Sequence, residues 1–182
     1  HDLIDLKECD LVFFSKDIPT NNKDKSLYDG IYKLIKKAIR HLNKKSNLII
    51  LSQVKPGFTD SIKWRRKKLY YQVETLIFGE AINRVLKPEQ FIIGSSDNKI
   101  NKSYLKFLKS YKSKINIMNY KSAELAKISI NLYLISSLSF TNSLAEACEK
   151  IDADWSKIQP ILKQDKRIGK YAYLNPGLGI LS

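Results

Sequence analysis

Two short apolar runs flank a segment with helical periodicity, and this arrangement constrains the fold more than any other feature of the sequence. The runs, Leu11–Phe14 and Leu48–Ser52, are typical of strands buried on both faces of a parallel sheet. Between them, apolar residues recur at helical spacing from Leu27 to Leu42. The segment from Leu11 to Ser52 is therefore predicted to be one βαβ unit with a right-handed crossover.

The remainder of the first two thirds of the chain continues this α/β pattern. We predict a basic helix over 62–69, a loop around 71–76, and a helix over 101–111, with short strands over 91–94 and 115–118. A Rossmann sheet normally opens with a strand and a G-x-G-x-x-G turn, and the 182 residues contain no such motif. The predicted fold class is therefore α/β, with an incomplete Rossmann-like parallel sheet.

From Ser122 onward the pattern is helical. A long helix is predicted from Ser122 to about Lys150, and because it is apolar on most faces we expect it to be buried. A further helix is predicted from Asp154 to Leu162, followed by a loop over 169–182. We therefore expect a sheet domain over residues 1–120 and an all-α domain over residues 121–182.

Charge and composition narrow the possible partners. The net charge of +14 comes from 32 Lys and Arg against 18 Asp and Glu, but 27 of the 32 are Lys, spread along the whole chain, so we expect a lysine-rich surface and no nucleic acid partner. Serines interrupt the most apolar stretch, Ile128–Phe140, which argues against a membrane span. Cys9 and Cys148 are too few and too far apart for a disulfide framework, and they favour a cytoplasmic location. His1 and His41 form no metal-ligand set.

A few polar residues stand out in apolar surroundings. Lys127 and Asn131 share one face of the long helix, with Glu124 three residues before Lys127. Either Glu124 and Lys127 form an ion pair, or Lys127 and Asn131 point into a cleft to meet an oxyanionic group. Glu74 is a candidate general base or a structural hydrogen-bond acceptor. Arg167 belongs either to a surface turn or to a clamp for phosphate or carboxylate.

Several segments, taken together and in order, resemble the nucleotide-sugar dehydrogenases, the group that contains UDP-glucose 6-dehydrogenase and GDP-mannose dehydrogenase. The resemblance covers almost the whole chain. Its most specific part is the helix pattern A-E-L-x-K-x-x-x-N followed by D-x-R-I-G. The matching segments are Asp10–Thr20, Ser52–Thr59, Val73–Glu74, Lys87–Gly94, Ser122–Asn131, Asn142–Asp154, Asp165–Gly169 and Pro176–Gly179.

The resemblance implies NAD as cofactor and a four-electron oxidation of the C6 alcohol of a UDP-sugar to the uronic acid. It implies that Lys127 stabilises oxyanion character at C6, that Asn131 places water or substrate, and that Glu74 assists thioester hydrolysis. Residues 1–120 would be the rear part of the NAD-binding domain, and residues 121–182 the central dimerisation and substrate domain, forming a homodimer through the helix at 122–150. The resemblance places the substrate at Arg167, Asn175, Gly177 and Gly179, and the cofactor at Pro19, Thr20, Ser52 and Gln53.

The sequence also departs from the family pattern. The glycine fingerprint is absent, and the family's nucleophilic cysteine, which lies in a G-G-x-C loop after P-G-x-G, has no counterpart after Pro176–Gly179. The family's N-P-E-F-L-x-E-G stretch corresponds to Gln72–Gly79, with Phe78 in place of the second acid, and S-T-V-P corresponds to Ser52–Lys55. We therefore expect a divergent subgroup and an incomplete, inactive portion of the enzyme. The alternatives are a non-catalytic helical dimerisation module and a basic nucleic-acid-binding protein.

Overall fold

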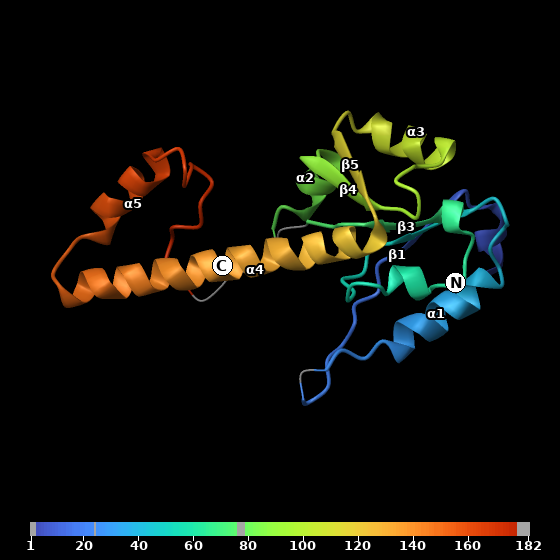
Figure 1. The fold of residues 1–182 in the computed structure, drawn as a ribbon, viewed down its shortest axis with the longest axis horizontal. Coiled ribbons are helices and arrows are strands. Elements are labelled where there is room, and N and C mark those ends of the chain that lie inside the picture. Colours follow the sequence, from blue (N-terminus) through green and yellow to red (C-terminus); the bar gives the residue numbers. More distant parts are fainter. Residues whose placement is uncertain (1–2, 24, 76–78, 178–182) are drawn as a thin grey trace. The chain divides into compact units, whose positions relative to one another are not determined.

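A computed structural model of the chain describes residues 3–23, 25–75 and 79–177, with side chains described from Asp5 onward. Figure 1 shows its helices and strands. The chain divides into two compact units, the first ending at Ile128 and the second beginning at Ser129. The predicted domain boundary after residue 120 stays a prediction. The elements, in chain order, are η1 Leu3–Glu8, β1 Leu11–Phe14, α1 Asp29–Ile39, β2 Asn47–Ile50, η2 Thr59–Ser61, η3 Arg66–Lys68, β3 Leu69–Gln72, α2 Ala81–Leu86, β4 Gln90–Gly94, α3 Lys102–Ser110, β5 Lys114–Met118, α4 Tyr120–Lys150 and α5 Trp155–Gln164.

The first unit is built on a five-stranded sheet in the order β1-β2-β3-β4-β5. This confirms the predicted α/β, Rossmann-like fold class, with one difference: β4 runs antiparallel to β3, so the sheet is mixed, whereas β1, β2 and β3 are parallel, as are β4 and β5. Helix α2, between β3 and β4, spans only six residues and is about 9 Å long. This is too short to carry the chain back across the sheet, so β4 starts at the edge where β3 ends and runs in the opposite direction. Past the end of β3, the amide of Val73 donates to Ile92 O at 3.0 Å and lengthens the pairing.

Side chains alternate between the two faces of this sheet. Ile49, Tyr70 and Ile93 pack in one cluster with Tyr104 and Leu108 of α3. The neighbouring strand residues point to the opposite face, on the side of α1, so that both faces are covered (Figure 1). Strand β2 is buried on both faces, as its apolar run predicted, whereas in β1 only Val12 and Phe14 are buried and Phe13 is 37% exposed, so the prediction of burial on both faces is wrong for β1.

The stretch between residues 62 and 76 differs from its prediction. The predicted basic helix over 62–69 is wrong: only Arg66–Lys68 forms a short 3-10 turn, and Leu69–Gln72 is strand β3, with all four residues buried. Spacing between Ile62 and Leu69 suggested a helix, but the aromatic pair Tyr70 and Tyr71 packs into the sheet instead. Helix α2, Ala81–Leu86, was not predicted from the sequence.

Helix α4 begins at Tyr120, two residues before the predicted Ser122, and continues to Lys150, where the prediction ended it. It starts against the sheet at Gly94, where an added Cβ would lie 3.1 Å from both the Cβ of Ala123 and the Cα of Tyr120. The prediction that this helix is buried is wrong within a single chain, because Leu132 is 58% and Phe140 is 66% exposed. Within the described residues, no helix combines the length and the apolar character that a membrane span requires.

Candidate active site

Lys127 and Glu74 come together at the point where β3 ends. The amino group of Lys127, on the second turn of α4, donates to the main-chain oxygen of Glu74 at 2.6 Å. Lys127 is half-buried, and burial lowers its pKa below the usual 10.5, against the opposing effect of the Glu74 carboxylate. These two residues, predicted separately from the sequence, are therefore adjacent, and they provide one hydrogen-bond donor and one carboxylate on the same edge of the sheet.

The Glu74 carboxylate is held by a side-chain relay that sequence reasoning missed. Gln72 Nε2 donates to Glu74 Oε1 at 2.8 Å, and the hydroxyl of Tyr104 donates to Gln72 Oε1 at 2.6 Å. Because the hydroxyl of Tyr104 occupies the amide oxygen, the amide nitrogen of Gln72 must face Glu74. The signal in the sequence was the Gln-x-Glu spacing, which places both side chains on one side of an extended segment.

An open cavity of about 330 Å³ lies beside this relay. Its polar lining includes Gln72, Glu74 and Arg84, and its remaining wall is largely aromatic and aliphatic. Ser15 and Leu51, which follow β1 and β2, also line it. The cavity therefore opens at the carboxyl ends of the three parallel strands, where open α/β sheets bind their ligands.

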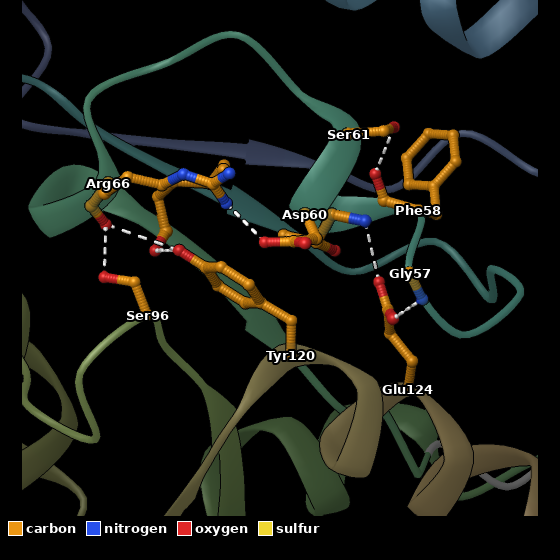
Figure 2. Close-up of polar contacts among 10 residues, drawn as sticks. Gly57, Phe58, Asp60, Ser61, Arg66, Ser96, Tyr120 and Glu124 are labelled. Carbon is orange, nitrogen blue, oxygen red and sulfur yellow. Dashed lines mark hydrogen bonds and ion pairs between the residues drawn. The ribbon is translucent and has the colours of Figure 1, made fainter.

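Glu124 has a different role from the one its spacing suggested. It is fully buried, and its two carboxylate oxygens accept hydrogen bonds from the amides of Gly57 at 2.5 Å and Thr59 at 2.7 Å (Figure 2). The expected ion pair with Lys127 is replaced by these contacts. Burial raises the pKa of Glu124, and the bonds from Thr59 and Gly57 oppose that shift. Glu124 thus fixes the loop that follows β2 to the same helix that carries Lys127.

The four predicted cofactor residues lie in the loops after β1 and β2. Ser52 is buried, and its hydroxyl donates to Lys16 O at 2.6 Å, so it joins the two loops. Pro19 and Thr20 are exposed, in a short loop closed by the Leu27 amide donating to Pro19 O. Gln53 is exposed beside Ser52. The two loops that carry these residues leave the sheet at the edge where β3 also ends, just before Glu74.

The other predicted residues belong to the second unit. Asn131 is half-buried on α4, one turn beyond Lys127. Arg167 is exposed and pairs with Asp165, with Nη2 at 2.6 Å from Oδ2 and Nε at 3.0 Å from Oδ1. This guanidinium lowers the pKa of the Asp165 carboxyl. The Asp165–Gly169 segment is thus a surface turn, and Gly169 has a φ of +86° that suits its glycine.

Side chains of α4 and α5 hold the segment 173–177 in place, which the sequence did not predict. Asn142 both donates to Gly177 O and accepts from the Gly177 amide, each at 2.9 Å. Gln159 Nε2 donates to Asn175 Oδ1 and to Leu174 O. Asn175 and Gly177 are therefore anchored by residues far away in sequence, whereas Gly179, also predicted to contact substrate, lies outside the described residues.

Replacing Asn142 with alanine is expected to release Gly177. Two hydrogen bonds to a partly exposed backbone are lost, so the free energy of unfolding should fall by about 1–2 kcal/mol. Amide hydrogen exchange at Gly177, measured by NMR, should become faster. Ser143→Ala is the matched control, because among the described residues the Ser143 hydroxyl bonds only to Ser139 O, within its own helix. Unchanged exchange at Gly177 would contradict the anchoring role.

Comparison with known proteins links the sequence and fold of this chain to one group of oxidoreductases. Residues 121–180 match the family model described as the central domain of the UDP-glucose/GDP-mannose dehydrogenase family. A UDP-glucose 6-dehydrogenase from Rickettsia bellii is 30% identical over 185 residues, which cover 96% of this chain and 42% of that protein. One from Campylobacter jejuni is 32% identical over 148 residues, covering 79% of this chain and 37% of that protein.

Solved structures show the same fold. A UDP-glucose dehydrogenase from Pyrobaculum islandicum has a TM-score of 0.82 at 22% identity, covering 98% of this chain and 44% of that one. A GDP-mannose dehydrogenase from Pseudomonas aeruginosa has a TM-score of 0.83 at 17% identity, covering 98% and 45%. The chain belongs to the UDP-glucose/GDP-mannose dehydrogenase family. It spans less than half the length of the relatives it matches.

Proposed function

We propose that the residues of this chain serve the NAD-dependent oxidation of the C6 alcohol of a UDP-sugar to the uronic acid. The observation that carries the proposal is the approach of Lys127 to Glu74 beside a cavity at the carboxyl ends of the parallel strands. The names of the relatives support UDP-glucose as the class of substrate. A cytoplasmic location and a homodimer are part of the same proposal.

Lys127 supplies electrostatic stabilisation in this proposal. An amino group that is half-buried and fixed at 2.6 Å from a carbonyl oxygen is already oriented before substrate arrives. Its protonated form stabilises negative charge that develops on the C6 oxygen, and exclusion of water strengthens the effect. Asn131 then offers an amide to substrate or water from the next turn of α4.

Glu74 acts as the general base for the hydrolytic step. A base must present its carboxylate in a fixed direction within hydrogen-bond reach of the water it activates. Gln72 provides that direction, because its amide nitrogen binds one carboxylate oxygen and leaves the other available for water. On the substrate side, the proposal assigns Arg167, Asn175 and Gly177 to the sugar nucleotide.

The residues present fit one side of a nicotinamide dinucleotide. Pro19, Thr20 and Gln53 are exposed after the carboxyl ends of β1 and β2, the position at which doubly wound sheets bind dinucleotides. Ser52 contributes by holding the two loops together through Lys16. NAD, when bound, accepts the hydride from C6; these residues would orient it and shield it from water.

Titration of the purified chain with UDP-glucose tests the proposal. We expect amide shifts near Lys127 and Glu74 that saturate, and their loss in Lys127→Met, while Lys150→Met, an exposed site on the same helix, has no effect. Absence of any saturating shift would overturn the substrate assignment. With NAD added, the absorbance of NADH is expected not to rise, because the glycine fingerprint and the nucleophilic cysteine are absent from the 182 residues.

A non-catalytic dimerisation module is the second candidate, and the exposed side chains of α4 favour it. Leu132, Ile135 and Phe140 are each more than half exposed, although apolar residues of this size are usually covered. Sedimentation of the chain should show a dimer, and Leu132→Glu should shift it to monomer. A monomer for the unmodified chain at high micromolar concentration would count against self-association through α4.

A further inference from the structure

A second cavity of the first unit lies at the opposite end of β3 from Glu74. It measures about 340 Å³, and its walls come from Ser95 and Ser96 after β4, Arg66 of η3, and Asn119, Tyr120 and Lys121 at the start of α4. Figure 2 shows Arg66, Ser96 and Tyr120 gathered there. The Tyr120 hydroxyl donates to Leu69 O at 2.9 Å, which places this cavity at the amino end of β3. None of the proposed catalytic or cofactor residues lines it.

Ser95 carries the unexplained group in this cavity. The residue is 1% exposed, and its main-chain amide donates to Met118 O at 2.9 Å. Its hydroxyl is buried, and among the described residues it has no hydrogen-bond partner. Buried hydroxyls are nearly always paired, because leaving one unpaired costs its full desolvation. The neighbouring Ser96 differs, since its hydroxyl donates to Arg66 O at 3.3 Å.

The charges around Ser95 favour an anion. Lys121 and Arg66 bring two positive charges to the wall, and α4, which is 31 residues long, begins there, so its macrodipole adds partial positive charge. Asn119 Oδ1 accepts a hydrogen bond from the Ser122 amide at 2.9 Å in this first turn. Asp60 also lines the cavity and bonds Arg66 Nη1 at 2.5 Å. This pairing offsets one charge and orients the guanidinium, whose remaining N–H groups are available to a ligand.

We propose that this cavity binds a phosphoryl group, as free phosphate or as a phosphate monoester. The hydroxyl of Ser95 donates to one oxygen of the ligand, and Lys121 and the first turn of α4 compensate its charge. The tetrahedral oxyanion supplies the hydrogen-bond acceptor that the hydroxyl of Ser95 lacks. The inference is independent of the proposed oxidation, since it uses residues at the other end of β3.

Titration of the chain with potassium phosphate, at constant ionic strength kept by potassium chloride, tests this site by NMR. We expect the amides of Ser95, Ser96 and Lys121 to shift together and to saturate in the millimolar range. Ser95→Ala and Lys121→Ala should each weaken binding about tenfold. Lys109→Ala, an exposed lysine on α3, should leave it unchanged. A parallel titration with methyl phosphate separates the two sources: whichever ligand binds more tightly identifies the source.

Thermal unfolding gives a second readout that separates a binding role from a structural one. Without phosphate, Ser95→Ala should unfold at the same or a higher temperature than the unmodified chain, because an unpaired hydroxyl is removed. With phosphate, the unmodified chain should gain stability and the variant should not. Shifts that grow linearly with phosphate and also appear with chloride alone, or a Ser95→Ala variant that keeps the phosphate effect, would overturn the proposal.

Discussion

Glu124→Ala is expected to lower the free energy of unfolding of the first unit by about 3–5 kcal/mol, because two hydrogen bonds to a carboxylate are lost and the amides of Gly57 and Thr59 are left without an acceptor. The site is fully buried, so water cannot replace the carboxylate. Glu124→Gln should recover only part of the loss, because the amide keeps one acceptor oxygen and directs an NH₂ at the other donor.

The measurement is urea denaturation followed by tryptophan fluorescence. The chain has two tryptophans, Trp64 in the first unit and Trp155 in the second, so a Trp155→Phe background makes Trp64 the reporter of the first unit. Glu146→Ala is the control on the same helix. Glu146 is exposed and pairs with Lys150, its one ion-pair partner in the described part of the chain, and its loss should change stability by no more than about 0.5 kcal/mol. Equal effects for the two variants would show that the Glu124 carboxylate does not fasten the loop.

Gly94→Ala is expected to lower the stability of the first unit by about 2 kcal/mol through overpacking. The added Cβ would meet the Cα of Tyr120 and the Cβ of Ala123 at 3.1 Å, and the Cβ of Tyr71 at 3.2 Å. None of these atoms is the free end of a flexible side chain, so the first turn of α4 must move away from the sheet.

Gly30→Ala is the matched control and should have the opposite sign. Gly30 lies in helix α1, and the only atom near its added Cβ is the Cε of Lys16 at 3.9 Å. Alanine should therefore raise stability by up to about 1 kcal/mol through its helix propensity. Hydrogen exchange adds a local test: Gly94→Ala should speed exchange at Ala123 and Glu124 more than at Ile49. A Gly94→Ala variant as stable as the unmodified chain would contradict the close contact.

The sequence allowed prediction of those elements whose pattern is local. Continuous apolar runs identified β1 and β2, and apolar residues at helical spacing identified α1 and α3. Burial of an element determines which of its positions are apolar, so the pattern can be recognised in the sequence. Strand β3 was missed because it follows a basic stretch, and because polar and apolar residues do not alternate over Tyr70, Tyr71 and Gln72. All four residues of β3 are buried, so both faces of the strand carry large side chains, and the sequence shows no alternation of polar and apolar residues.

The candidate site was predictable only in part, for a related reason. The resemblance identified Lys127 and Glu74, which the structure brings together. Spacing along a helix shows which residues share a face, but it does not show which distant loop that face meets. For this reason an ion pair between Glu124 and Lys127 remained one of two alternatives, although Glu124 binds Gly57 and Thr59. Tyr104 and Asn142 likewise act on residues more than thirty positions away.

Val73 changes how the backbone beside Glu74 is held. In the family pattern a proline precedes the glutamate, and its ring restricts the backbone while providing no amide hydrogen. Here the Val73 amide donates to Ile92 O at 3.0 Å, a bond that proline could not make. The backbone beside Glu74 is therefore held by a hydrogen bond to the neighbouring strand and not by a locked dihedral angle, while Gln72 directs the carboxylate. Changes in the pairing of β3 with β4 are therefore expected to shift the backbone at Glu74, which follows Val73 directly.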